Sequence, residues 1–268
     1  MKEFAERYGP WALVTGASSG IGEAFARRIA EIGLNLVLVA RRDDILRNLA
    51  EELQSKHRIS TRVVSVDLAQ DKFLPTIQQS THDLQIGLLV NNAGIATTGN
   101  FLDNDLNSEL RMLSVNNRAP VILTHHFGRL MRQRGQGGII VVASILAFAG
   151  VPTMSNYAAS KAHDLVFAEG LANELQNCEV SVLAICPGAT HTGLWPPGAG
   201  PSTSVRPEAV ADVALRNLGR RFTAVAGWKN VMTVLSTRML PRSWNARIYG
   251  WVVRGMLSGT KTPSQMSR

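Results

Sequence analysis

The sequence predicts an α/β domain with a doubly wound parallel sheet and helices on both faces. Short, almost wholly apolar segments rich in β-branched residues alternate with segments of helical period along most of the 268 residues. Strands of a parallel sheet are buried on both faces, so they are apolar throughout, as these segments are. A glycine cluster also joins the first apolar segment to the first helical one, as in loops that hold a nucleotide phosphate.

The apolar segments and the segments between them give the expected order of elements. Strands are predicted at residues 11–15, 35–40, 62–66, 86–90, 139–142 and 181–185. Helices are predicted at 21–32, at about 44–56, between the third and fourth strands, near 108–134 and at 157–177. Gly33 stops the first helix. The uncharged run at 137–156 contains Gly150 and Pro152, so it is interpreted as a buried strand and an apolar loop, not a membrane span.

Composition and charge exclude several classes of protein. The two cysteines are too few for a disulfide framework, and neither they nor the histidines have the spacing of a metal site. No metal is therefore expected. The N-terminus lacks the apolar region of a secretory signal, which favours a reduced, cytoplasmic setting. The formal net charge of +8 comes from the C-terminal end, where ten bases and no acid follow Asp212. No nucleic-acid motif accompanies those bases, so no nucleic-acid partner is expected.

The basic C-terminal segment permits two interpretations. Apolar residues recur at helical spacing, and arginines lie between them. The apolar positions are Val231, Val234, Leu235, Met239, Trp244, Ile248, Trp251, Val252 and Met256. Such a segment can lie on anionic lipid as a peripheral membrane contact. It can equally pack on the domain or on a partner subunit.

The glycine-rich loop carries the first chemical signal. Thr15-Gly16-x-x-x-Gly20-Ile21-Gly22 joins the first predicted strand to the first helix. Glycines there let the backbone approach a pyrophosphate, which is favoured at the positive N-terminus of the helix. This placement predicts a dinucleotide site.

A tyrosine and a lysine carry the second signal. Tyr157 and Lys161 are four residues apart in a predicted helix, so their side chains share one face. An adjacent ammonium favours the phenolate and lowers the pKa of a tyrosine from its usual value of about 10. This pair therefore predicts a proton donor that works near neutral pH.

These motifs together resemble the short-chain dehydrogenase/reductase family, in its short single-domain form. The resemblance covers about residues 10–195 and includes further motifs in the family's order. These are Asn91-Asn92-Ala93-Gly94 after the fourth strand, Asn116 after a valine, Ser144 thirteen residues before Tyr157, and Pro187-Gly188 after the sixth strand. It implies a Rossmann-type domain over 1–228, with a lid loop at about 188–207. Residues 229–268 are then a basic C-terminal helical extension of the same domain.

The resemblance also implies a nicotinamide cofactor. The expected contacts are Gly16, Ser18, Ser19, Gly20, Ile21, Gly22, Arg41, Arg42, Asp67, Leu68, Asn92, Ala93, Gly94, Tyr157, Lys161, Pro187, Gly188 and Thr192. Ala40 occupies the place where NAD-preferring relatives carry an aspartate, and two arginines follow it. An arginine there accommodates a ribose 2′-phosphate, so NADP (NADPH) is the expected cofactor. Asp67 either contacts the adenine or caps the next helix.

The resemblance assigns catalysis to Asn116, Ser144, Tyr157 and Lys161. Tyr157 would be the general acid/base and Ser144 would hold the substrate oxygen. Lys161 would lower the tyrosine pKa and bind the nicotinamide ribose, and Asn116 would support a water that relays protons to Lys161. The predicted activity is carbonyl reduction or alcohol oxidation by an enzyme that forms a homodimer or homotetramer. The alternative is an NADP-binding sensor or scaffold without turnover.

The residues expected to face the substrate are mostly apolar. They are Ile95, Ala96, Ile145, Leu146, Phe148, Val151, Met154, Leu194 and Trp195. They follow the carboxyl ends of the strands, where such folds bind ligands. No arginine for a carboxylate or phosphate lies among them, so an apolar ketone, aldehyde, alcohol or 3-oxoacyl-type substrate is expected.

Overall fold

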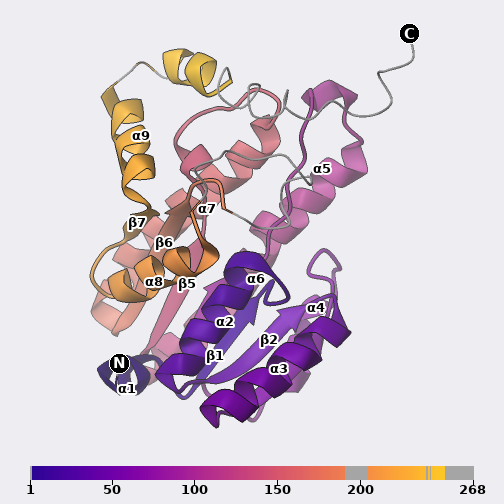
Figure 1. The fold of residues 1–268 in the computed structure, drawn as a ribbon, viewed down its shortest axis with the longest axis vertical. Helices are drawn as coiled ribbons and strands as arrows, with labels where there is room; N and C mark the ends of the chain where they lie inside the picture. The colour runs from indigo at the N-terminus through magenta and orange to yellow at the C-terminus, as the bar shows by residue number, and fades with distance from the viewer. Residues whose placement is uncertain (1, 191–204, 240, 242, 251–268) are drawn as a thin grey trace.

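The fold is a single parallel sheet covered by helices on both faces (Figure 1). The computed structural model describes residues 2–190, 205–239, 241 and 243–250. The strands are β1 (Trp11–Thr15), β2 (Asn35–Ala40), β3 (Thr61–Ser65), β4 (Ile86–Asn91), β5 (Gly137–Val142), β6 (Val180–Pro187) and β7 (Thr223–Ala226). They lie in the order β3-β2-β1-β4-β5-β6-β7 and pair in parallel throughout. The predicted doubly wound fold is confirmed.

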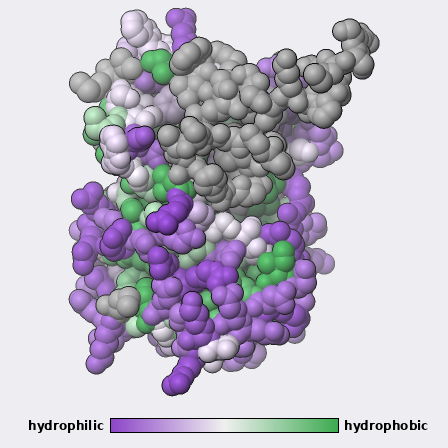
Figure 2. Space-filling view, in the orientation of Figure 1, coloured by the Kyte–Doolittle hydropathy of each residue, from purple (hydrophilic) through white to green (hydrophobic). Residues whose placement is uncertain are grey.

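Nine α-helices occur among the described residues, and most of them connect consecutive strands. They are α1 (Lys2–Tyr8), α2 (Gly20–Ile32), α3 (Asp43–His57), α4 (Phe73–Thr81), α5 (Leu106–Leu113), α6 (Ala119–Arg134), α7 (Ser155–Glu174), α8 (Pro207–Asn217) and α9 (Trp228–Met239). Residues 243–250 form one more short helical stretch. The outward side chains over α2 and α3 are predominantly hydrophilic (Figure 2).

Two hydrophobic clusters cover the two faces of the sheet. Leu36 and Leu38 of β2 pack in the cluster that includes α2, α3 and α8. Val37 and Val39 of the same strand belong to the opposite cluster, with α4, α6 and α7. Successive side chains of a strand point to opposite faces, so both sets are buried. This explains why the strands are apolar at every position rather than at alternate ones.

Several parts of the chain differ from the sequence-based expectation. The helical region predicted near 108–134 contains a π-helical turn, Ser114–Arg118, between α5 and α6. The helix predicted at 157–177 spans Ser155–Glu174, and the 3₁₀ turn Gln176–Cys178 follows it. Elements α1, α8 and β7 were not predicted. β7 is an edge strand of four residues, too short to give a clear period.

The strand order places the functional region. The chain crosses from β3, at one edge, back to β4 beside β1, so connections leave β1 and β4 in opposite directions. In open α/β sheets a crevice forms outside the carboxyl ends of the strands at such a switch point. The loops that follow β1 and β4 are the glycine-rich loop and the segment that begins at Asn92.

Candidate active site

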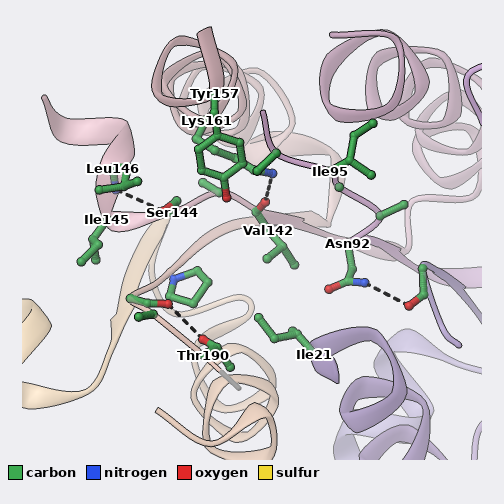
Figure 3. Close-up of a pocket in the computed structure, with 18 of the residues that line it drawn as sticks. Ile21, Asn92, Ile95, Val142, Ser144, Ile145, Leu146, Tyr157, Lys161 and Thr190 are labelled. Atoms are coloured by element: carbon green, nitrogen blue, oxygen red, sulfur yellow. Dashed lines mark hydrogen bonds between the residues drawn. The ribbon is translucent and has the colours of Figure 1, made fainter. Parts of the chain in front are cut away.

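A pocket of ≈ 840 Å³ lies along the carboxyl ends of the strands. It is lined by most of the residues predicted from sequence: Gly16, Ser18, Ser19, Ile21, Arg41, Arg42, Asp67, Leu68, Asn92, Ala93, Gly94, Ser144, Tyr157, Lys161, Pro187 and Gly188. Figure 3 shows part of this lining, with Tyr157 and Lys161 entering from one helix and Ile21 and Asn92 on the other side. Gly20, Gly22 and Asn116 are not among the lining residues, and Thr192 lies outside the described residues.

The glycine loop is shaped by close backbone contact. Gly16 has φ of +68°, a conformation that favours glycine. At Gly22, in the first turn of α2, a methyl group would lie 2.5 Å from the Asn92 side-chain nitrogen and would overlap the Gly16 carbonyl. Gly22 therefore acts by letting the helix approach the loop, which leaves the amides of the helix N-terminus at the pocket.

Thr15 and Asn92 join the glycine loop to the segment after β4. The Thr15 hydroxyl donates to the Val90 carbonyl and accepts from the backbone N–H groups of Asn92 (2.9 Å) and Ala93 (3.0 Å). The Asn92 side chain donates in return to the Thr15 carbonyl at 2.8 Å. These bonds bring the two loops of the switch point together.

Two arginines follow β2 at one end of the pocket. The Arg42 guanidinium donates to the hydroxyl of Ser18 (3.0 Å) and to its carbonyl (3.2 Å). Arg41 is exposed and also lines the pocket. Neither guanidinium forms an ion pair within the part of the chain that the structure describes. The donor set of Ser18, Arg41 and Arg42 fits a ribose 2′-phosphate, which binds through charged donors of this kind.

Asp67 does more than the sequence indicated. Its carboxylate accepts from the Arg111 guanidinium at 2.7 Å and from the backbone N–H of Ala69 at 3.0 Å. These hydrogen bonds hold the pKa of Asp67 below its ordinary value, although burial opposes them. Arg111 of α5 lines the pocket as well, and sequence reasoning missed it. Asp67 therefore both closes a local turn and anchors α5 beside the pocket.

Tyr157 and Lys161 lie one turn apart on α7, as their spacing predicts, and both are almost fully buried. Burial raises the pKa of Tyr157, and the neighbouring Lys161 charge and a hydrogen bond with Ser144 oppose that rise. The pKa of Tyr157 is therefore raised, whereas its spacing from Lys161 predicted a lowered pKa. The reason is that desolvation of the phenolate outweighs the attraction of the ammonium.

Ser144 lies at the start of the 3₁₀ turn Ile145–Phe148, two residues after the end of β5. Its side chain caps that turn by accepting from the Leu146 backbone N–H at 3.1 Å (Figure 3). A capping hydroxyl has a fixed position, and its own hydrogen remains available to a second acceptor. The serine thus presents a donor beside the Tyr157 phenol.

Asn116 lies behind the pocket, in the π-helical turn, and is fully buried. Its side chain donates to the Ile95 carbonyl and accepts from the Ile95 N–H, at 3.0 and 2.9 Å. It also donates to the Ser160 hydroxyl at 3.1 Å. A methyl group built on Gly94 would lie 3.5 Å from the Asn116 oxygen and 3.6 Å from Lys161 Nζ. The asparagine therefore braces the segment that faces the lysine.

The wall expected to face the substrate is only partly as predicted. Ile95, Ala96, Ile145 and Leu146 line the pocket. Val151 and Met154 are instead buried in a small cluster with Tyr157 and Tyr249, and Phe148 packs on the core. Leu194, Trp195 and most of the predicted lid lie outside the described residues.

The C-terminal segment supplies pocket residues that sequence reasoning missed. Lys229, Asn230, Thr233, Ser236, Thr237, Asn245, Ile248 and Tyr249 all line the cavity. On α9, Val234 is buried whereas Trp228 and Met232 are 74% and 60% exposed. Among the described residues no helix has the length and apolar character needed to cross a bilayer. Peripheral lipid contact and homo-oligomerisation stay predictions, and Trp251, Val252 and Met256 lie outside the described residues.

Comparison with known proteins decides the family. A sequence profile described as short chain dehydrogenase matches residues 10–198, more than half of the chain. The protein belongs to the short-chain dehydrogenase family. Its members are oxidoreductases that act on CH–OH and C=O groups, and this chain is one of them.

Relatives of this short-chain dehydrogenase cover most of its length. A 7beta-hydroxysteroid dehydrogenase of Clostridium sardiniense is 31% identical over 85% of this chain and 89% of its own. A very-long-chain 3-oxoacyl-CoA reductase of Meyerozyma guilliermondii is 30% identical over 83% and 68%. The solved short-chain dehydrogenase from Sphingobium yanoikuyae in complex with NADPH superposes with a TM-score of 0.77. That pair is 28% identical, with 97% of this chain and 100% of the other covered.

Proposed function

We propose that this short-chain dehydrogenase uses NADP(H) to interconvert a bulky apolar ketone and its secondary alcohol. The observation that carries the proposal is one pocket with two chemically distinct ends. Arg41, Arg42 and Ser18 lie at one end, and Tyr157, Ser144 and an apolar wall lie at the other. The NADPH complex of the related Sphingobium protein supports the choice of cofactor.

The cofactor would be held by groups described above. The glycine loop and the first amides of α2 receive the pyrophosphate, and Arg41, Arg42 and Ser18 receive the 2′-phosphate. Lys161 is placed to bind the nicotinamide ribose. When bound, NADPH supplies the hydride for the carbonyl carbon.

The protein residues supply the proton and stabilise the charge on oxygen. The Ser144 hydroxyl donates to the substrate carbonyl oxygen, where negative charge develops during reduction. Tyr157 then transfers its proton to that oxygen as the general acid. The buried Lys161 ammonium stabilises the phenolate that remains. In the oxidative direction the phenolate accepts the hydroxyl proton of the alcohol.

The substrate class follows from the wall of the pocket. Ile95, Ile145 and Leu146 line the pocket, and Ile248 and Tyr249 line it from the C-terminal segment, alongside polar side chains of that segment such as Thr233. A wall of this kind favours a rigid apolar skeleton, since burial of apolar surface is its main source of affinity. We infer a polycyclic or similarly bulky ketone, supported by the hydroxysteroid dehydrogenase relatives. A long-chain 3-oxoacyl substrate is the second candidate, supported by the 3-oxoacyl-CoA reductase relatives.

A panel assay tests this function. The purified protein is mixed with NADPH and with steroid ketones, bicyclic ketones, 3-oxoacyl thioesters and short ketones, and NADPH absorbance is followed. We expect turnover of the bulky ketones and little turnover of the short ones. NADPH binding without turnover of any class would favour the sensor or scaffold role instead.

The cofactor preference is tested at the arginines. Arg41→Ala and Arg42→Ala should each weaken NADPH binding about ten- to a hundredfold, because a charge-assisted hydrogen bond contributes about 1.5–3 kcal/mol. NADH lacks the 2′-phosphate, so its dissociation constant should change far less. Cofactor fluorescence titration measures both values.

Arg47→Ala is the matched control for the arginine variants. Arg47 lies on α3, is paired with Asp43 and does not line the pocket. Its loss should leave both cofactor affinities unchanged. An equal loss of NADH and NADPH binding in the Arg41 and Arg42 variants would argue against the 2′-phosphate contact.

A further inference from the structure

An acidic residue, Asp164, lies one helical turn beyond Lys161 and has no role in the functions described so far. It is 1% exposed, and its Oδ2 atom is 3.0 Å from Lys161 Nζ. Its Oδ1 atom accepts from the Asn117 side chain at 3.1 Å. Asn117 also donates to the Ser160 carbonyl at 2.8 Å, which holds the amide in place. A carboxylate is therefore built into the core, directly behind the reactive pair.

Asp164 determines how Lys161 is held. The lysine ammonium donates to the Val142 carbonyl at 2.8 Å (Figure 3) and to Asp164. An ammonium has three hydrogens, so two are engaged in fixed directions and the third remains for the pocket. Burial alone would favour the neutral amine. The carboxylate reverses this, and the pKa of Lys161 lies above its ordinary value.

We propose that Asp164 is a positioning residue of the reaction, which fixes the Lys161 ammonium on the Val142 carbonyl and balances its charge beside the Tyr157 phenol. With this balance, Tyr157 keeps its proton until the carbonyl oxygen of the substrate takes it. The inference rests on the proposed function, because it concerns how Asp164 favours proton donation by Tyr157 in that reaction.

Asp164 is the main negative charge beside Lys161, because none of the following groups around it is an anion. On α7 it faces Lys161 and the half-exposed His163, whose Nδ1 atom is 3.7 Å from Oδ1. From β6, Cys186 is the titratable neighbour, and burial raises the pKa of its thiol to about 12, so it stays neutral. From the π-helical turn come the neutral amides of Asn116 and Asn117.

The charge of Asp164 has a predictable sign. It opposes loss of a proton from Tyr157 and from Lys161 alike, so it raises the pH at which this coupled pair first loses a proton. Asp164→Asn keeps the shape and removes the charge. The alkaline limb of reductive kcat/KM, which needs protonated Tyr157, should move to lower pH. The acid limb of oxidative kcat/KM, which needs the phenolate, should move the same way. Each shift should be about one unit or more.

The matched control is the other buried carboxylate near the site. Glu109 is 3% exposed, accepts from Asn104 and Asn156, each at 2.7 Å, and does not contact Lys161. Glu109→Gln should leave both limbs in place, whatever it does to stability. Unshifted limbs in Asp164→Asn, or equal shifts in both variants, would overturn the proposal. If Asp164→Asn fails to fold, Asp164→Glu replaces it, and its retained charge should keep the limbs near the wild-type pH while kcat falls.

A titration without substrate separates this inference from the proposed function. The chain has three tyrosines, so the ultraviolet phenolate signal of the wild type minus that of Tyr157→Phe reports Tyr157 alone. The same difference in the Asp164→Asn background should titrate at lower pH. If no ketone is turned over, the proposed function fails, yet this titration still tests the role of Asp164. An unchanged midpoint of the Tyr157 titration in Asp164→Asn would contradict that role.

Discussion

Replacing Tyr157 by phenylalanine should reduce turnover about 10³-fold or more while leaving NADPH binding near the wild-type value. A positioned general acid contributes roughly 10²–10⁴-fold, and in the oxidative direction the same group, as the phenolate, accepts the proton of the alcohol. A factor of 10³ corresponds to about 4 kcal/mol of transition-state stabilisation. The buried ring is kept, so packing around α7 should persist. Single-turnover kinetics with an accepted ketone and fluorescence titration of NADPH measure the two quantities.

Ser144→Ala provides the companion measurement. It removes one donor to the developing oxyanion, a loss of about 10²–10³ in kcat for such groups. The substitution also removes the cap on the Ile145–Phe148 turn, so the melting temperature of the variant must be recorded alongside.

Substantial turnover in Tyr157→Phe would show that another group donates the proton. In the wild type, burial raises the pKa of Tyr157, so reductive kcat/KM should hold through neutral pH and fall only as pH rises through that pKa.

Gly22→Ala should weaken NADPH binding severely and destabilise the fold. The added methyl would lie 2.7 Å from the Gly16 carbonyl carbon and 2.5 Å from the Asn92 side-chain nitrogen. Backbone atoms cannot rotate away, so the start of α2 must move from the loop that would receive the pyrophosphate. Forced overpacking of this kind typically costs about 1–3 kcal/mol. Chemical denaturation and NADPH titration measure the two effects.

Gly170→Ala is the control for that substitution. Gly170 lies exposed on α7, and a methyl group there meets nothing within 4 Å. The same chemical change should therefore stabilise the protein by about 0.5–1 kcal/mol, because alanine favours a helix. NADPH affinity should stay unchanged. Normal NADPH binding in Gly22→Ala would show that the close approach of α2 is not needed for the cofactor.

Much of the fold could be predicted because its signals are local. The strands β1 and β2 were predicted with their observed bounds, since each is an unbroken apolar run between polar residues. The π-helical turn at Ser114–Arg118 could not be predicted, because its sequence continues a helical period. In that turn Asn116 bonds to the Ile95 backbone, a partner 21 residues away that no local pattern specifies.

The candidate site shows the same division. Most residues of its short motifs line one pocket, because each motif lies at the carboxyl end of a parallel strand or on the adjacent helix. Arg111 and Tyr249 were missed, since no local pattern marks a residue that reaches the pocket from a distant helix. Val151 and Met154 were placed on the substrate wall, yet both are buried in a small cluster beneath it.

The sequence by itself determined the order of the first six strands, the glycine loop and the spacing of Tyr157 and Lys161. These depend on side-chain periodicity and on neighbours within a helical turn, which the chain states directly. Only the tertiary structure decided the protonation of Tyr157 and the position of the Lys161 ammonium. The pKa of Tyr157 depends on its desolvation and on the hydrogen bond with Ser144. The position of Lys161 depends on the Val142 carbonyl, 19 residues away, and on Asp164, a charge that acts strongly because the core excludes water around it.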